Sequence, residues 1–143
     1  MVSFQSAASA DLSELVTYLN DAVLLAPSFL LDEHVTWEGT GPRSFRVHLT
    51  DGVLTVSADV SLDGRGRPTS FTTTDRWCAL PSGLVQARWT TPIDTWTVLD
   101  DRPYPTSGAA VWELPGGPFR YIDGRFVPGT IVWDGAAPVE VPS

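Results

Sequence analysis

The carboxylate of Asp75 is the side chain in this sequence that best fits acid–base chemistry. A threonine-rich, β-prone segment covers residues 69–77, and strand alternation places Asp75 on the same face as Phe71 and Trp77. If that face lines the protein interior, desolvation raises the pKa of the carboxyl group and makes it a general acid or base. The alternative is structural: Asp75 pairs with an arginine across the strands, such as Arg88, and holds the sheet together.

Tyr18 and Arg88 are the side chains that we expect to act with Asp75. Apolar residues recur at helical spacing from Leu12 to Val23, and Tyr18 lies beside this stripe. Its hydroxyl could reach the mouth of a cavity and donate a hydrogen bond to a ligand carbonyl. Arg88 would polarise a carbonyl or an alkene in the same site. The predicted catalytic residues are therefore Asp75, Tyr18 and Arg88.

Six tryptophans, all on predicted strands, indicate either a filled core or an aromatic-walled cavity. Core filling is the simpler interpretation, although a buried indole N–H needs a hydrogen-bond partner. Small and polar residues between the tryptophans, such as Thr73, Ala87 and Thr91, favour the cavity because they leave room. The cavity hypothesis assigns substrate contacts to six aromatic residues, namely Trp37, Phe71, Trp77, Trp89, Trp112 and Trp133.

The sequence carries no pattern for a metal, a nucleotide or a covalent nucleophile. His34 and His48 belong to no metal-binding motif, and we interpret His48 as a surface residue. Cys78 is the one cysteine, and we interpret it as a buried structural thiol. There is no lysine for a Schiff base or a P-loop, and no Gly-x-Ser-x-Gly elbow. We therefore expect no metal and no cofactor.

The charge balance argues against nucleic-acid and membrane partners. The chain has 143 residues and a net charge of −8, from 17 acidic side chains against 9 basic ones, all arginine. Nucleic-acid binding needs a basic face, and an acidic surface is repelled by an anionic membrane. No apolar stretch reaches the ~20 residues of a membrane span, and the N-terminus has no secretory signal. These features predict a cytoplasmic protein.

Two periodicities divide the chain into a helical start and a β region. Asp11 and Glu14 form a capping box that predicts a helix start at residue 11. Pro27 predicts the end of this helix or the start of a second, short one. Alternation and turn signals then predict strands over residues 34–38, 43–50, 53–62, 68–77, 84–91, 95–99, 109–114, 119–122 and 125–133.

These seven to nine short strands, joined mostly by hairpin turns, predict a mainly β (α+β) fold. A long antiparallel meander curls in order to bury its apolar face. We therefore expect a barrel or a half-open cup, with one or two N-terminal helices covering one mouth. The expected organisation is a flexible arm over 1–8, a single domain over 9–134 and an irregular tail over 135–143.

Six sequence segments follow one another in a recognisable order and spacing. They are YLNDAVLLAPSFLL, VTWEG, LTDGVLTVSADVSLDGRGRPTSF, TDRW, the stretch around TTPIDTW, and AAVWELPGGPFRYIDGRF. Through these segments, from about Tyr18 to Trp133, the chain resembles an uncharacterised bacterial domain family. There, a similar domain forms the C-terminal half of longer, often membrane-anchored proteins, whereas here we expect it to be freestanding. The resemblance implies no activity and no site residues.

The preferred hypothesis is a cofactor-free cyclase or isomerase in natural-product biosynthesis, for example for a pericyclic cycloaddition. Folding a flexible apolar substrate into a reactive shape needs neither a metal nor a nucleophile. One alternative is a non-catalytic carrier or sensor of a lipid-like ligand, which needs the cavity but no buried ionisable group. Another is a protein-interaction module with a solid core. A monomer and a homodimer are both compatible with the sequence.

Overall fold

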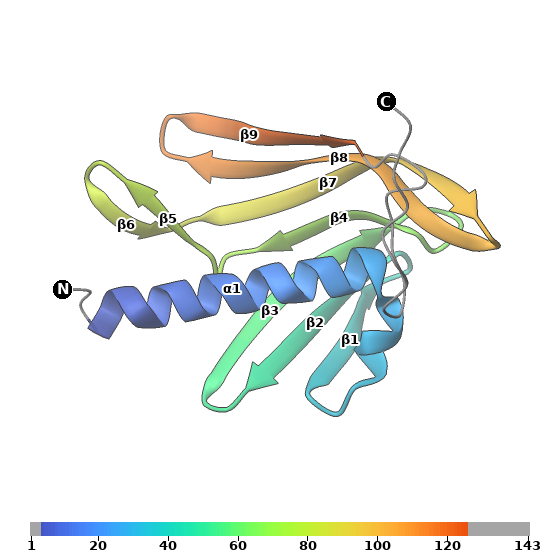
Figure 1. Ribbon diagram of the computed structural model, residues 1–143, viewed down its shortest axis with the longest axis horizontal. Coiled ribbons are helices and arrows are strands. Elements are labelled where there is room, and N and C mark those ends of the chain that lie inside the picture. Colours follow the sequence, from blue (N-terminus) through green and yellow to red (C-terminus); the bar gives the residue numbers. More distant parts are fainter. Residues whose placement is uncertain (1–3, 126–143) are drawn as a thin grey trace, which may run out of the picture.

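The computed structural model describes residues 4–125, with side chains from residue 8 onward. A long helix, α1 (Phe4–Leu25), leads into a short 3-10 helix, η1 (Pro27–Leu31), as Figure 1 shows. The strands that follow within this range are β1 (Val35–Gly41), β2 (Ser44–Asp51), β3 (Leu54–Leu62), β4 (Pro68–Thr73), β5 (Trp77–Leu80), β6 (Gly83–Gln86), β7 (Arg88–Leu99), β8 (Arg102–Leu114) and β9 (Gly117–Arg125).

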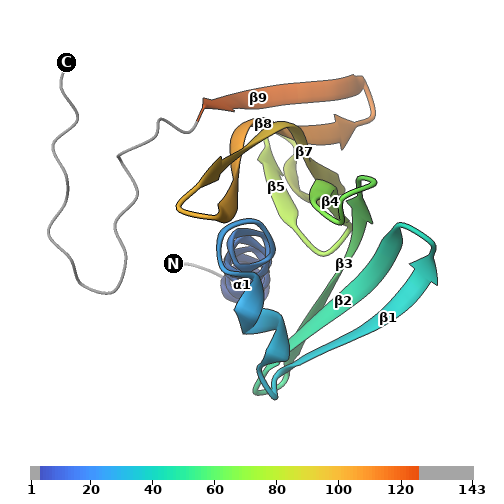
Figure 2. The same ribbon diagram turned by 90° about the vertical axis from the view of Figure 1, so that its right-hand side faces the viewer.

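One antiparallel sheet of seven strands dominates the fold, in the order β1-β2-β3-β4-β7-β8-β9. Strands β5 and β6 form a separate hairpin. The predicted mainly β, antiparallel meander is therefore confirmed. Over residues 4–125 the sheet remains open, with β1 and β9 at its edges, and no closed barrel forms. Figure 2 shows the sheet curving around α1, which lies along its concave face instead of covering one end.

The core lies between α1 and the concave face of the sheet. Val16, Leu19 and Val23 are at most 3% exposed, and their spacing of three and four residues puts them on one side of the helix. Val60 and Phe71, on neighbouring strands, are completely buried in the same cluster. The apolar face of the helix and the apolar face of the strands thus pack into one core. The ends and flanks of the helix remain for other contacts.

The N-terminal boundary differs from the prediction. The helix begins at Phe4, inside the segment 1–8 that we expected to be a flexible arm, and Asp11 lies in the helix interior and not at its cap. Residues 7, 8 and 10 are alanines, whose high helix propensity extends the helix upstream of the capping signal. None of the described helices is long and apolar enough to cross a bilayer. The expected tail over 135–143 lies outside the described residues.

Candidate functional site

An apolar pocket of about 690 Å³ lies at the C-terminal end of α1. Its walls come from the end of α1, from η1 and from the facing ends of β2, β3, β7 and β8. Leu24, Phe45, Leu62, Trp96 and Tyr104 are among its apolar lining residues. Its volume lies within the range of roughly 300–1,000 Å³ that is typical of small-molecule sites.

Hydrogen bonds at the strand ends hold the polar parts of this wall in place. The indole Nε1–H of Trp96 donates to the carbonyl oxygen of Pro68 at 2.8 Å. This bond satisfies the polar group of the ring, so its apolar surface can line the pocket. Pro27 starts η1, where its fixed φ suits the first helical position. Tyr104, only 5% exposed, closes the pocket from β8.

The charged residues that line the apolar pocket are Arg67 and Arg102, and none of its described lining residues is acidic. Arg67 is held by Asp63, whose Oδ2 accepts from Arg67 Nε at 2.8 Å. Oδ1 of the same carboxylate accepts the backbone N–H groups of Arg67 and Arg65, at 2.9 and 2.8 Å. These bonds, the backbone N–H of Arg67 first, lower the pKa of Asp63. The β3–β4 turn thus keeps a guanidinium at the pocket.

A second, smaller pocket of about 270 Å³ lies on the flank of α1 that faces β7, β8 and β9; we call it the helix-side pocket. The guanidinium of Arg76 sits over the ring of Trp89, 4.4 Å from its centroid. Trp89 Nε1 donates to the hydroxyl of Tyr121 at 2.9 Å, and Arg76 donates to Thr17 Oγ1 at 2.5 Å. An aromatic wall and a cation therefore face each other in this pocket.

Polar side chains of α1 complete the helix-side pocket. Buried Thr91 donates its hydroxyl to Asn20 Oδ1 at 2.6 Å, and Asn20 Nδ2 donates to Asp21 Oδ1 at 3.3 Å. Burial raises the pKa of Asp21, although the bond from Asn20 and the charge of Arg76 act in the opposite direction. Part of the Asp21 side chain still reaches solvent, so this carboxyl group could exchange protons with water.

The two pockets are adjacent. Leu24 and Leu25, in the last turn of α1, line both of them. These two leucines therefore separate a molecule in the apolar pocket from the polar groups around Asp21. This combination of an apolar volume with a few polar groups at one end is typical of ligand-binding sites.

Asp75 lies outside both of these pockets, contrary to the prediction. The strand expected over 69–77 is broken, because β4 ends at Thr73 and β5 starts at Trp77. Asp75 Oδ2 accepts the backbone N–H of Ser57 at 2.8 Å, where β4 has left β3, while the Thr73 hydroxyl donates to the Ser57 carbonyl. The Asp75 carboxylate therefore takes the place of a backbone acceptor from a neighbouring strand, and it lies away from the core.

The three predicted catalytic residues do not all come together, because Tyr18 lies apart from the other two. Asp75 and Arg88 line a polar pocket of about 320 Å³ on the face of the sheet away from α1, the outer pocket. Arg88 Nε lies 3.7 Å from Glu113 Oε1, so the arginine contacts a carboxylate of β8 in place of Asp75. Tyr18 is 55% exposed and packs edge-on against Phe29, with centroids 5.0 Å apart. It lines none of the three pockets.

The predicted aromatic wall is dispersed over the fold. Phe71, Trp89 and Trp112 are buried, at 0%, 4% and 7% exposure, and Trp89 alone of these three lines a pocket. Trp37 is 59% exposed on β1, and Trp77 is half-buried on the β5–β6 hairpin. Core filling is therefore the correct interpretation for Phe71 and Trp112. Trp133 lies outside the described residues.

Sequence reasoning missed the residues that shape the pockets. Trp96, Tyr104, Arg67 and Arg102 surround the apolar pocket, and Asp21 belongs to the helix-side pocket. Asp21 lies three residues after Tyr18, but nothing in the sequence shows how far the sheet reaches around that side of the helix. A signal for Arg67 was present in the Asp63-Gly64-Arg65-Gly66 turn, which brings Arg67 back toward Asp63.

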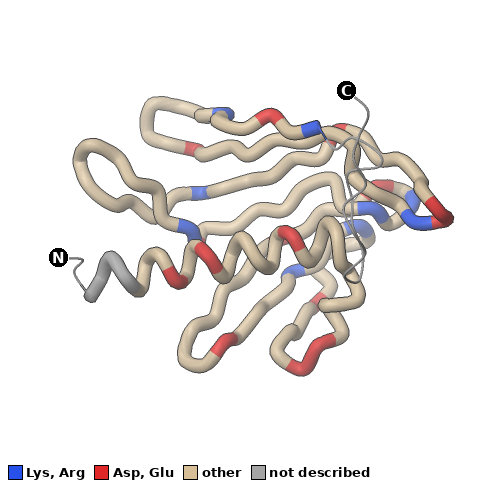
Figure 3. Tube along the Cα trace, viewed as in Figure 1, with Lys and Arg blue, Asp and Glu red and all other residues tan. Residues whose placement is uncertain are grey.

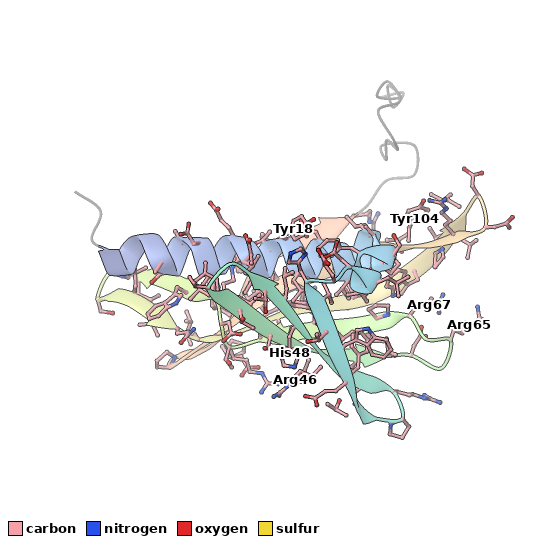
Figure 4. The ribbon with its side chains drawn as sticks, turned by 90° about the horizontal axis from the view of Figure 1, so that it is seen from below. Tyr18, Arg46, His48, Arg65, Arg67 and Tyr104 are labelled. Atoms are coloured by element: carbon pink, nitrogen blue, oxygen red, sulfur yellow. The ribbon has the colours of Figure 1, made fainter. Side chains whose placement is uncertain are left out.

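His48 belongs to a polar ladder on the outer face of β1, β2 and β3. Its Nδ1 lies 2.6 Å from Ser57 Oγ, and its Nε2 lies 3.7 Å from Glu38 Oε1. Ser57, His48 and Glu38 are the residue types of a serine-hydrolase triad. Such an enzyme also needs N–H donors that bind an oxyanion, and the backbone N–H of Ser57 is already bonded to Asp75. Figure 4 shows His48 and Arg46 turned away from α1. Within residues 4–125, no three His, Cys, Asp or Glu side chains gather as metal ligands.

A family model matches residues 2–124, which is most of the chain. The chain belongs to DUF6544, a family of unknown function. This match confirms the resemblance to an uncharacterised domain family and covers the helix and nearly all of the described strands. The DUF6544 match assigns no ligand and no reaction to the pockets. Neither a curated protein nor a solved structure matches the chain.

Proposed function

We propose that this DUF6544 protein binds an apolar small molecule in the apolar pocket. The observation that supports the proposal is the open volume of about 690 Å³ lined by leucine, phenylalanine, tryptophan and tyrosine side chains at the end of α1. Contiguous apolar surface that a protein leaves accessible marks an interaction site more often than an accident of packing. A concave surface of this size fits a small molecule better than a flat protein partner.

The burial of an apolar ligand would supply the affinity. Each CH₂ group removed from water contributes about 0.8 kcal/mol, so that a chain of ten carbons has several kcal/mol available before binding costs. The walls are held by the Trp96–Pro68 hydrogen bond and by the Asp63 turn, so little of this free energy is needed to order them. A preformed site of this kind suits a carrier or a sensor.

Fluorescence titration with Nile red, an uncharged apolar dye, tests this proposal. Ser28 is exposed and lines the pocket, so Ser28→Trp places a large ring in it. Ser82 is exposed in the β5–β6 turn, far from the lining, and Ser82→Trp is the matched control. We expect saturable dye emission with the wild type and with Ser82→Trp, and a loss with Ser28→Trp. Equal dye binding by all three proteins would contradict the proposal.

As a second candidate function, we propose cofactor-free cyclisation or isomerisation in the helix-side pocket. The observation that favours it is the group formed by Asp21, Arg76 and Tyr121 next to an apolar volume. Asp21 would donate a proton to a polyene and take one back after the double bonds have moved, so that the mass of the substrate is unchanged. Arg76 would stabilise the carboxylate between these two steps.

Chromatography of flexible polyenes after incubation with the protein tests this second function. Asp21→Asn should abolish the formation of isomeric products while Nile red still binds. Asp75→Asn is the matched control and should leave the products unchanged, since Asp75 lines the outer pocket. If the wild type forms no isomers although it binds dye, the carrier or sensor function stands alone. If the wild type binds neither the dye nor a polyene, the interaction-module hypothesis takes the place of both functions.

A further inference from the structure

The charges around the apolar pocket differ in sign from those of the whole chain. The chain carries 17 acidic and 9 basic side chains, yet the charged residues of the pocket lining are two arginines, Arg67 and Arg102. Figure 3 shows several basic segments, with acidic segments beside them, at the end of the sheet where the β3–β4 turn and β8 lie. Arg43 is a further contributor, since its guanidinium lies beside Gly64 of that turn. Two cationic side chains in the lining, on a protein of negative net charge, favour an anionic ligand group.

Three acidic residues of the described chain, Asp63, Asp100 and Asp101, lie in the turns near the pocket but do not line it. Asp63 organises the β3–β4 turn through two backbone N–H groups and Arg67 Nε, and it does not line the pocket. Asp100 and Asp101 form the β7–β8 turn with positive φ values of 49° and 62°, and they do not line the pocket either. Among the described lining residues, Arg67 and Arg102 are therefore the charged side chains nearest to a bound molecule.

The geometry of Arg67 suits recognition of a carboxylate. A guanidinium has five N–H donors, and the bond to Asp63 uses only Nε. Its terminal nitrogens can bind both oxygens of a carboxylate in the fork arrangement that arginine favours. Figure 4 shows Arg67 and Arg65 at the same end of the molecule as Tyr104, beyond the end of α1. The positive group thus lies at the border between the apolar wall and the solvent.

We propose that the ligand of the apolar pocket is an anionic amphiphile: an aliphatic body with a carboxylate that Arg67 and Arg102 bind. This inference rests on the proposed function, since it names the class of molecule for the same pocket. The body fills the space between Leu24, Phe45 and Trp96 while the carboxylate stays at the rim. The partly desolvated position of the head group strengthens the ion pair relative to one in bulk water.

Displacement of Nile red by three twelve-carbon compounds tests the charge preference. Dodecanoate, dodecanol and dodecylammonium share one chain and differ in the head group. We expect dodecanoate to bind at least about tenfold tighter than dodecanol, since hydrogen bonds to charged groups are the stronger ones, and dodecylammonium to bind weakest. Added salt should weaken dodecanoate and leave dodecanol unchanged. All measurements stay below the aggregation concentration of each compound.

Arginine variants assign the charge effect to its residues. Arg67→Gln and Arg102→Gln should each lower dodecanoate affinity about fivefold to tenfold and leave dodecanol affinity unchanged. Arg88→Gln, on the outer face, removes the same charge from the chain and serves as the control. If a pocket variant does not fold, as judged by circular dichroism, the wild-type comparison of the three compounds still decides the proposal.

The outcomes separate this inference from the proposed function. Nile red binding with equal affinities for dodecanoate and dodecanol would overturn the anionic ligand while the apolar pocket stands. A preference for dodecanoate that Arg88→Gln abolishes as strongly as Arg67→Gln would also overturn it, because the effect would then come from overall charge. If neither the dye nor any of the three compounds binds, the proposed function fails together with this inference.

Discussion

Replacing Asp75 by alanine removes the acceptor of the Ser57 N–H at the point where β4 leaves β3. The bond is 2.8 Å long and half-buried, and Asp75 N–H in turn donates to Thr73 Oγ1 at 3.1 Å. Hydrogen bonds to charged groups contribute about 1.5–3 kcal/mol, and partial exposure favours the lower end. We expect Asp75→Ala to lower the free energy of unfolding by about 1–2 kcal/mol. The melting temperature should fall by roughly 3–8 °C.

Asp75→Asn is the matched control, because its amide oxygen can still accept the Ser57 N–H. Urea denaturation should place this variant within about 0.5 kcal/mol of the wild type. Amide hydrogen exchange supplies the specific readout: the Ser57 N–H should exchange faster in Asp75→Ala than in Asp75→Asn. Equal stability of the alanine variant and the wild type would refute the structural role. A loss of ligand processing in Asp75→Asn alone would restore the catalytic prediction for this residue.

Three further predictions follow from the packing and from one carboxyl group. Gly108→Ala places a Cβ 2.8 Å from the carbonyl oxygen of Pro92 and should lower the free energy of unfolding, measured in urea, by about 1–3 kcal/mol. Gly39→Ala is the control, because its Cβ meets nothing within 4 Å. Equal losses of stability in the two variants would contradict the importance of the Pro92 contact. Phe71→Ala, at a completely buried site, should cost about 3–5 kcal/mol in the same assay, and a cost under about 1 kcal/mol would exclude its core role. Burial raises the pKa of Asp21 in the folded protein, so the fold loses stability as the pH rises through that pKa. Compared with the wild type, Asp21→Asn should therefore melt at a slightly higher temperature at pH 7 and at the same temperature at pH 3. A higher melting temperature that persists at pH 3 would show a different cause.

The strand pattern of the sheet could be predicted from the sequence where one face is buried. Val56, Ala58 and Val60 alternate with exposed or half-exposed residues along β3, because the inner face packs against α1. Gly52 has a φ of 60° and turns β2 into β3, as the Thr50-Asp51-Gly52 signal predicts. Local patterns of this kind depend on neighbours along the chain, which the sequence displays directly.

The candidate site could not be predicted, because its residues meet through long-range geometry. No proline or glycine marks the break after Thr73, so the sequence predicts an unbroken strand through Asp75. The curvature of the sheet decides which tryptophans reach a pocket, and it places Trp96 at the apolar pocket while Trp112 fills the core. Of the predicted barrel or half-open cup, the closed barrel does not form over residues 4–125 for a similar reason: α1 occupies the concave face and buries it without closure.

Two-dimensional NMR of the tryptophan indole N–H groups during a titration with dodecanoate tests the central claim most directly. Trp96→Phe identifies the signal of the indole that lines the apolar pocket, and Trp77 and Trp112, which do not line it, serve as internal references. We predict a saturable shift of the Trp96 signal with little change at the two references, and a smaller shift in Arg67→Gln at equal ligand concentration. A Trp96 signal that does not move at saturating dodecanoate would contradict the account.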